Sequence, residues 1–219
     1  MSEPLSWLWL IPALPLLGSV ALGTLHFITL RARKEDPEAT GTGRWAAVVA
    51  VAAVALSCAV AVLGFLRILP GSGVEALTST SWDWIHVGGG LRVEVALVLD
   101  RLSGAMALVV TGVGLLIHIY AAGYMKGDPG YAKFFAYLNL FVAAMLMLIL
   151  SGNLVGMFVG WEGVGLCSYL LIGFWYTKGA EKGWPAQSAQ KAFDVNRIGD
   201  ACFLIGSFLM IQLIGTLDL

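Results

Sequence analysis

The sequence predicts an all-α integral membrane protein with about six transmembrane helices and a β-hairpin on its outer face, between the second and third helices. Composition is the first indication: hydrophobic residues make up 58% of the 219 residues and charged residues only 12%. Soluble domains carry about a quarter charged residues. Long charge-free runs are the second indication, because about 20 apolar residues cross a bilayer core as a helix. The net charge of −1 suggests neither nucleic acid nor an acidic partner.

The spans follow one another along the chain. The first four contain no Asp, Glu, Lys or Arg and cover residues 7–30, 45–66, 102–125 and 134–150. The fifth covers residues 154–176 and begins after the break Ser151-Gly152-Asn153. The sixth is expected to begin with a polar stretch, residues 191–200, and to continue as an apolar run to Leu217.

The segment between the second and third spans, residues 78–100, has a different pattern. Gly88-Gly89-Gly90 separates two stretches that are rich in β-branched and aromatic residues. Such a pattern predicts a β-hairpin. An irregular loop with a reentrant part is the alternative.

Lysine and arginine predict the orientation, because cytoplasmic loops carry an excess of these residues. On one side, the first, third and fifth loops with the start of the sixth span contain Arg31, Arg33, Lys34, Arg44, Lys126, Lys133, Lys178, Lys182, Lys191 and Arg197. The opposite side has only Arg67, Arg92 and Arg101. The odd loops are therefore expected to face the cytoplasm, or the matrix in a mitochondrion, and the N-terminus the outer side.

Glu162 is the single charged residue of the fifth span. At about 1.5 Å per residue, it lies roughly 12 Å from the outer end of the helix. A charge near the membrane centre costs about 2.5–3.5 kcal/mol on insertion scales, and intramembrane acids are functional candidates by default. Burial favours the neutral carboxyl, so Glu162 is a candidate proton relay; a structural carboxyl is the alternative. Gly160, Gly163 and Gly165 allow another helix to approach closely, but no cation of this chain is expected to be well placed as a partner.

The sixth span opens with charges of alternating sign at every third position: Lys191, Asp194, Arg197 and Asp200. Residues three apart are neighbours on a helix, so successive members are expected to touch. An interfacial salt-bridge ladder, with Lys191 reaching the membrane surface, is an equal alternative to function for the first two. For the deeper Arg197 and Asp200 we favour function. Asp200 is expected to lie toward the inner side and Glu162 toward the outer side, with a relay through water and other helices in place of a direct contact.

His118 in the third span could join a proton path, because imidazole titrates near neutrality. A buried histidine with its hydrogen bonds satisfied is at least as strong an alternative. The cysteines have no paired spacing for a metal site. Two glycine motifs, GVGLLI and GVGLCS, lack the third glycine and the strand context of a dinucleotide fold, and no P-loop is present. This chain alone is therefore expected to bind no nicotinamide, flavin, ATP, metal or iron–sulfur cluster.

Several of these segments resemble one known family. The segments are GWEGVGLCSYLLIGFWY, LVLDRLS, VVTGVGLLIHIYAAGYM, GYAKFFAYLNLFVAAM and NRIGD. They resemble the antiporter-like subunit L of NADH–quinone oxidoreductase, respiratory complex I, from about residue 91 to residue 200. Members of this family are proton-translocating membrane subunits, similar to subunits of multi-component cation/proton antiporters.

The resemblance implies a function and a site. It implies a subunit of NADH:quinone oxidoreductase that couples quinone reduction elsewhere in the complex to proton movement, with no redox chemistry in this chain. In the family, the glutamate of the fifth helix, here Glu162, pairs with a lysine on a broken seventh helix. The family's polar residues at the start of the sixth helix correspond to Arg197 and Asp200. With Lys191 and His118, these residues form the predicted proton pathway.

The resemblance also implies surroundings and layout. NAD, flavin, iron–sulfur clusters and quinone would be bound by other subunits, and the partners would be the other membrane subunits of complex I and the lipid bilayer. The bacterial inner membrane is the expected location, with the mitochondrial inner membrane as an alternative. Family members are much longer, so this chain resembles their N-terminal part. It would comprise two helices (residues 1–77), the hairpin with the third helix (78–133) and the start of the antiporter-like repeat (134–219).

Two other functions stay open from the residues. One is a subunit of a multi-component cation/proton antiporter, which has no redox role. The other is a membrane assembly module in which Glu162 is structural.

Overall fold

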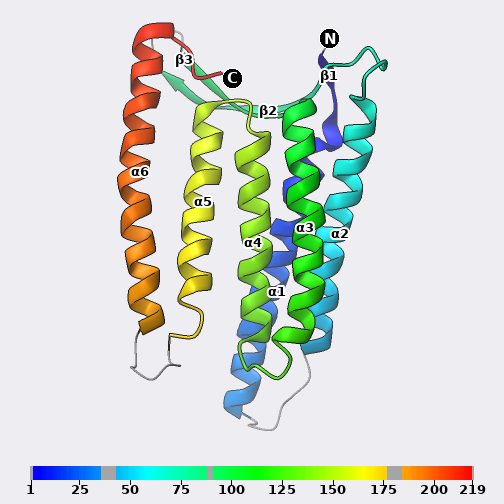
Figure 1. The fold of residues 1–219 in the computed structure, drawn as a ribbon, viewed down its shortest axis with the longest axis vertical. Coiled ribbons are helices and arrows are strands. Elements are labelled where there is room, and N and C mark those ends of the chain that lie inside the picture. Colours follow the sequence, from blue (N-terminus) through cyan, green and yellow to red (C-terminus); the bar gives the residue numbers. More distant parts are fainter. Residues whose placement is uncertain (1, 36–42, 88–90, 177–183, 219) are drawn as a thin grey trace.

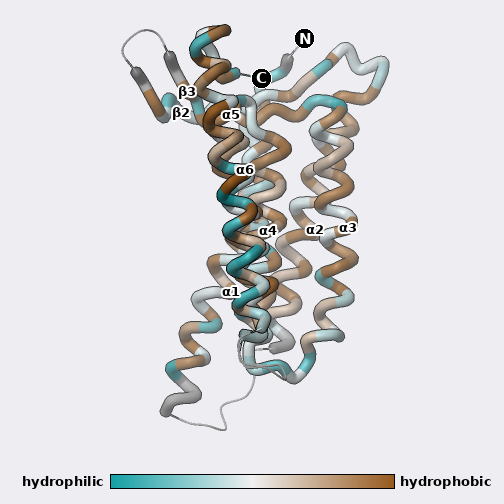
Figure 2. Tube along the Cα trace, turned by 60° about the vertical axis from the view of Figure 1, so that its left-hand side comes forward, coloured by the Kyte–Doolittle hydropathy of each residue, from teal (hydrophilic) through white to brown (hydrophobic). Residues whose placement is uncertain are grey.

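Six long helices stand side by side in a computed structural model, which describes residues 2–35, 43–87, 91–176 and 184–218 (Figure 1). Every one contains a segment long and apolar enough to cross a membrane, as the sequence predicts. Figure 2 shows their apolar character and the more hydrophilic part of the sixth helix. In chain order, the helices are α1 (Leu10–Glu35), α2 (Gly43–Arg67), α3 (Arg101–Tyr124), α4 (Tyr131–Leu150), α5 (Leu154–Ile172) and α6 (Trp184–Ile214).

A small sheet lies at the end of the bundle where α2 ends and α3 begins (Figure 1). Strands β2 (Ala76–Val87) and β3 (Leu91–Leu99) pair antiparallel, which confirms the predicted hairpin. The expected turn, residues 88–90, lies outside the described residues. A short strand that the sequence did not predict, β1 (Ser2–Pro4), pairs parallel with β2. A 3₁₀ turn, η1 (Ser6–Trp9), then leads into α1.

Asp100 joins the sheet to α3 as an N-cap. Its Oδ1 accepts a 2.7 Å hydrogen bond from the Ser103 amide, and the Ser103 hydroxyl accepts a 2.8 Å bond from the Asp100 amide, which forms a capping box. Partial burial opposes ionisation of this carboxyl, but the hydrogen bonds from Ser103 prevail and hold its pKa below the usual value. Asp100 therefore begins a helix at the membrane surface, which is the simplest role for its position.

Helix α4 occupies the middle of the bundle and packs on α1, α2, α3 and α5. Its contact with α5 depends on glycines that have no side chain to keep the helices apart. A Cβ atom on Gly160 would lie 2.6 Å from the Cα of Leu148, and one on Gly163 would lie 2.9 Å from the Cβ of Ala144. The predicted close approach is thus confirmed for Gly160 and Gly163. Gly165 faces α6, where a Cβ would make an ordinary 3.6 Å contact with Asn196.

Helix α6 stands at one edge of the bundle and packs on α5 (Figure 1). Within the described residues, only 6% of its apolar span is buried, against 44% for α4. It begins at Trp184, earlier than the predicted start at Lys191. This earlier start decides the depth of the charged residues on α6.

We predict that Gly160→Ala destabilises the protein. A methyl group at this position meets the backbone of α4, which cannot move aside as a flexible side chain can, and overpacking of this kind costs about 1–3 kcal/mol. The measurement is the thermal unfolding of the detergent-solubilised assembly that contains the chain. Gly112→Ala in α3 is the matched control, because a Cβ there meets nothing within 4 Å. It should be neutral or stabilising by about 0.5–1 kcal/mol; equal effects of the two substitutions would contradict the close-packing explanation.

Candidate functional site

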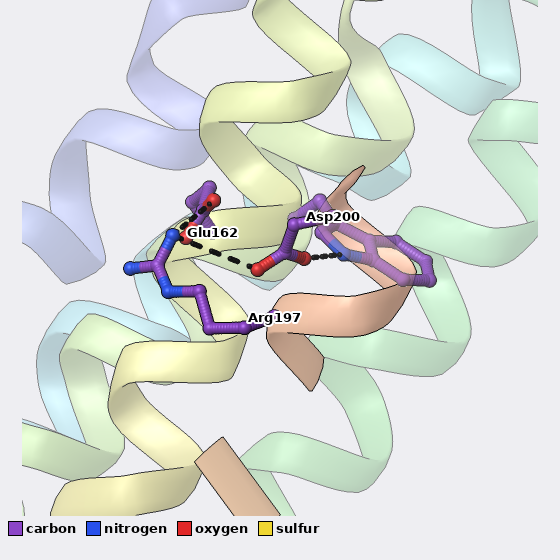
Figure 3. A network of polar contacts seen from close by, with 4 residues as sticks. Glu162, Arg197 and Asp200 are labelled. Carbon is purple, nitrogen blue, oxygen red and sulfur yellow. Dashed lines mark hydrogen bonds and ion pairs between the residues drawn. The ribbon is translucent and has the colours of Figure 1, made fainter. Parts of the chain in front are cut away.

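The candidate site is a charged cluster between α5 and α6. The Arg197 guanidinium Nη1 donates a 2.8 Å hydrogen bond to Glu162 Oε1, and the two side chains form an ion pair (Figure 3). This contact corrects the expectation that no cation of this chain lies close enough to pair with Glu162. The side chain of Arg197 is 52% exposed and that of Glu162 is 26% exposed.

A second carboxyl group shares the same guanidinium. Asp200 Oδ2 lies 3.7 Å from Arg197 Nη1, one helical turn away (Figure 3). The other oxygen of Asp200, Oδ1, accepts a 2.8 Å hydrogen bond from the indole Nε1 of Trp161. Asp200 is buried, with 8% of its side chain exposed. The cluster therefore contains a single guanidinium and two carboxyl groups within the described part of the chain.

The predicted separation in depth between Glu162 and Asp200 is wrong. Because α6 begins at Trp184, Arg197 lies roughly 20 Å along this helix instead of near its N-terminal end. Glu162 lies roughly 15 Å from the corresponding end of α5, Ile172. The charged residues of α6 therefore meet Glu162 near the middle of the bundle.

The expected ladder on α6 forms only in its last step, between Arg197 and Asp200. Lys191 and Asp194 are both exposed, and neither takes part in an ion pair among the residues that the structure describes. The Arg197 side chain instead pairs with Glu162 on α5. Its guanidinium carbon lies 4.7 Å from the ring centroid of Phe193, which is on α6 like Arg197 itself. The ion pair between the two helices thus takes the place of the first two steps of the ladder on α6.

Aromatic side chains hold α5 against α6 beside the cluster. The ring of Phe203 lies 5.5 Å from that of Phe158 and 6.2 Å from that of Trp161, with the Trp161 pair stacked. At the other end of the contact, Tyr169 meets Phe193 edge to face at 5.6 Å. These contacts fix the orientation of the two helices on both sides of the charges.

His118 is not part of this cluster. It is fully buried on α3, with Nδ1 2.7 Å from the Gly114 carbonyl and Nε2 3.3 Å from the amide nitrogen of Asn139 on α4. The Asn139 amide also donates to the Phe135 carbonyl at 3.0 Å, and the His118 ring packs beside the Phe135 ring. Both ring nitrogens have partners, which favours the satisfied buried histidine over the proton path.

The arrangement has a simple charge balance. A guanidinium stays protonated in proteins, so the cluster carries one excess negative charge when both carboxyl groups are ionised. One bound proton neutralises it. A cluster of this composition in an apolar span can therefore take up and release a proton without moving a chain segment. Among the described residues, no group of three or more His, Cys, Asp and Glu is arranged to hold a metal ion.

Sequence reasoning missed two residues of these polar networks. Trp161 directly precedes Glu162. Its indole was not distinguished from the other aromatic residues of the span, so its role as a hydrogen-bond donor was not predicted. Asn139 was the single amide of its span and could have been identified as a partner, because a buried amide requires hydrogen bonds. The charged residues were found because charges are rare in these spans.

Two family models match the chain. Residues 84–135 match the N-terminus of chain 5 of NADH-ubiquinone oxidoreductase (complex I), and residues 151–219 match the transmembrane family of NADH:quinone oxidoreductase and Mrp antiporters.

Curated relatives cover most of the chain. NADH-quinone oxidoreductase subunit L of Mycobacterium tuberculosis is 42% identical over 96% of this chain and 30% of its own length. The Escherichia coli subunit L is 45% identical over 80% of this chain and 28% of its own length, and the Pseudomonas aeruginosa subunit L is 46% identical over 81% and 29%. The chain thus spans less than a third of the length of these relatives.

Solved structures share the fold. A chain of the membrane-bound sulfane sulfur reductase, an archaeal respiratory membrane complex, superposes with a TM-score of 0.70 at 20% identity. The match covers 96% of this chain and 38% of that chain. A chain of the Mrp complex from Dietzia superposes with a TM-score of 0.63 at 25% identity, over 94% of this chain and 20% of that chain. Both confirm the antiporter-like fold.

We predict that His118→Leu lowers stability and leaves proton movement per assembled complex unchanged. The substitution removes the partner of the Asn139 amide, and a buried donor left without a partner costs about 1–3 kcal/mol. Thermal unfolding in detergent measures the first effect, and proton uptake by sealed vesicles, normalised to the amount of assembled complex, measures the second. Uptake that falls while stability is unchanged would instead place His118 in the proton pathway.

Proposed function

The chain corresponds in sequence to the N-terminal part of the antiporter-like subunit L of NADH-quinone oxidoreductase, and we propose that it belongs to a proton-translocating membrane subunit of such a complex. Quinone reduction elsewhere in the complex drives the proton movement. The redox cofactors are held by other subunits, and this chain supplies part of the proton path without redox chemistry of its own.

The observation that carries the proposal is the cluster of Glu162, Arg197 and Asp200 at mid-depth between two membrane-spanning helices. Charged side chains at this depth are costly and mark ion and proton pathways. Two carboxyl groups that share one guanidinium require one proton for neutrality. We assign the exchangeable proton of the pathway to this cluster, with Lys191 as the charge nearer the end of α6. The buried His118 is left outside this assignment.

Glu162 is placed to accept a second cation. A quarter of its side chain is exposed, and α5 and α6 are the least covered spans in the described part of the chain. The resemblance supplies such a cation, a lysine on a broken seventh helix. When that lysine approaches, it competes with Arg197 for Glu162 and favours the ionised carboxylate; when it withdraws, the proton returns. A change in the redox part of the complex can drive protons by moving this lysine.

The orientation follows from the positive residues. Lys126 and Lys133 lie around the α3–α4 connection, at the end opposite the sheet (Figure 1). Because lysine and arginine accumulate in cytoplasmic loops, we place this end in the cytoplasm and the sheet on the outer side of a bacterial inner membrane. Arg31, near the same end of α1, is exposed. The remaining positive residues of the first and fifth loops, Arg44, Lys178 and Lys182 among them, belong to segments whose side chains lie outside the described residues. The partners are other membrane subunits of the complex and lipid.

A cation/proton antiporter subunit is the second candidate. The matched transmembrane family includes Mrp antiporters, and a chain of an Mrp complex has the same fold. The sequence favours the first candidate, since the relatives at 42–46% identity are subunits of NADH-quinone oxidoreductase. The same carboxyl cluster would serve either function, so the driving reaction distinguishes them.

We predict that Glu162→Gln abolishes most proton translocation. The substitution keeps the size of the side chain but removes the group that gains and loses the proton. The measurement is NADH-driven proton uptake by sealed inverted vesicles that contain the complete complex, normalised to the amount of assembled complex. Loss of one positioned proton-transfer group should lower the rate by at least about 100-fold.

Glu94→Gln on the outer hairpin is the matched control, because it removes an exposed carboxylate from the same chain and should leave uptake unchanged. An assembled Glu162→Gln complex that pumps at the normal rate would overturn the proposed function. Uptake that follows a sodium or potassium gradient and ignores NADH would favour the antiporter. Failure of only this variant to assemble would favour a structural Glu162.

A further inference from the structure

The two carboxyl groups of the cluster have different freedom to move. Asp200 has 8% of its side chain exposed, and its Oδ1 is held by the 2.8 Å hydrogen bond from Trp161. Arg197 has 52% of its side chain exposed and a long, flexible stem. The carboxylate on α6 is therefore a fixed point, and the guanidinium is the part that can change place.

Trp161 is the cause of this difference. Its ring lies on α5 and stacks at 6.2 Å and 27° on Phe203, which is three residues beyond Asp200 on α6. Most residues around Asp200 on α6 are exposed, yet Asp200 is buried. The indole covers the carboxyl group and donates to one of its oxygens, which leaves Oδ2 directed toward Arg197 (Figure 3).

Trp161 and Glu162 are consecutive residues, so they project about 100° apart from α5. One contacts Asp200 and the other contacts Arg197, which are one helical turn apart on α6. The helix pair is therefore joined by two neighbouring polar contacts. A shift of the guanidinium from 3.7 Å to hydrogen-bond distance of Asp200 Oδ2 requires a movement of only about 1 Å.

We propose that Trp161 is a positioning residue that holds Asp200 in place, so that Arg197 alternates between Glu162 and Asp200 while a proton moves the opposite way. The inference rests on the proposed function of the cluster. With Arg197 on Glu162, as in the structure, the proton resides on Asp200 Oδ2. When Arg197 moves to Asp200, the O–H bond of Asp200 breaks and an O–H bond forms on Glu162, directly or through water. One proton and one guanidinium exchange places, and the net charge of the cluster is unchanged.

A purely structural role for Trp161 predicts a different set of effects. In that case the stacking on Phe203 is its whole contribution, and the indole N–H is dispensable. Trp161→Phe separates the two roles, because phenylalanine keeps an aromatic ring against Phe203 and removes the donor. Trp175→Phe is a matched control, since Trp175 donates a 3.0 Å hydrogen bond to Asp128 Oδ2 at the end of the α5 region.

The test measures NADH-driven proton uptake per assembled complex in four backgrounds: wild type, Trp161→Phe, Asp200→Ala and the double variant. Trp161→Phe removes a hydrogen bond that Asp200 accepts also when it is ionised, in the state with Arg197 on Asp200, and this loss should lower uptake about 10-fold. In the Asp200→Ala background, Trp161→Phe should have no further effect, because its partner is already absent. Trp175→Phe should pump as wild type does. Independent effects of Trp161 and Asp200 would overturn the proposal, as would normal uptake in Trp161→Phe.

Infrared difference spectroscopy provides a readout that packing alone would not change. The wild-type complex should show the carbonyl band of a protonated carboxyl that disappears in Asp200→Ala. That band should shift in Trp161→Phe, which loses the hydrogen bond, and stay in place in Trp175→Phe. If Trp161→Phe assembles poorly, comparing this band between the wild type and Asp200→Ala still tests the proposal. Absence of the band from the wild type would overturn the proposal.

Glu162→Gln, measured in parallel, separates this proposal from the proposed function. If Glu162→Gln pumps normally, the function assigned to the cluster fails. If Glu162→Gln abolishes uptake and Trp161→Phe does not lower it, only the positioning role of Trp161 fails.

Discussion

One guanidinium shared by two carboxyl groups is the interaction on which the structure of this chain depends. Removing a charge from water costs several kcal/mol even after relaxation, and an ion pair recovers this only with good geometry and further hydrogen bonds. Arg197 supplies the opposite charge to Glu162, and Trp161 supplies a donor to Asp200. Among the described residues, no further charged side chain forms an ion pair with these three. The cluster is thus stable enough to exist in a membrane and short of one positive charge.

The packing of α4 on α5 determines where this cluster lies. Gly160 and Gly163 let the backbone of α5 approach α4 closely on one face, and Trp161 and Glu162 project from other faces toward α6. At the end of α5 next to the sheet, Asn153 caps this helix and also donates a 2.6 Å hydrogen bond to the Glu94 carbonyl of β3. Helix α5 therefore connects the sheet, the central helix α4 and the charged cluster. Its contact with the hairpin holds one end of α5 in place and so sets the depth of the cluster along the helix.

Hydropathy was sufficient to predict the six helices, because a long apolar run can cross a bilayer only as a helix or as part of a closed barrel. The run of three glycines between two β-rich stretches predicted the hairpin. The strand β1 was not predictable, since three residues of ordinary composition pair only when β2 is already in place. The charged site residues were identified by their rarity. The contacts between these residues were not predicted. The depth of Arg197 depends on the start of α6 at Trp184, and this start was missed because the polar segment QSAQ before Lys191 resembles a loop. Trp161 carried no signal, since its role depends on a partner on another helix.

The identity of the donor to Asp200 follows from the charge balance. A lysine or arginine at the position of Trp161 would also hold the carboxylate, and with a charge-assisted bond that is roughly twice as strong. It would also bring the cluster to neutrality and leave no place for a proton. An indole is a donor only and carries no charge, so it fixes the geometry of Asp200 while the deficit of one positive charge remains. A neutral donor on a buried acid is therefore the arrangement that combines a fixed carboxyl position with the capacity to exchange one proton.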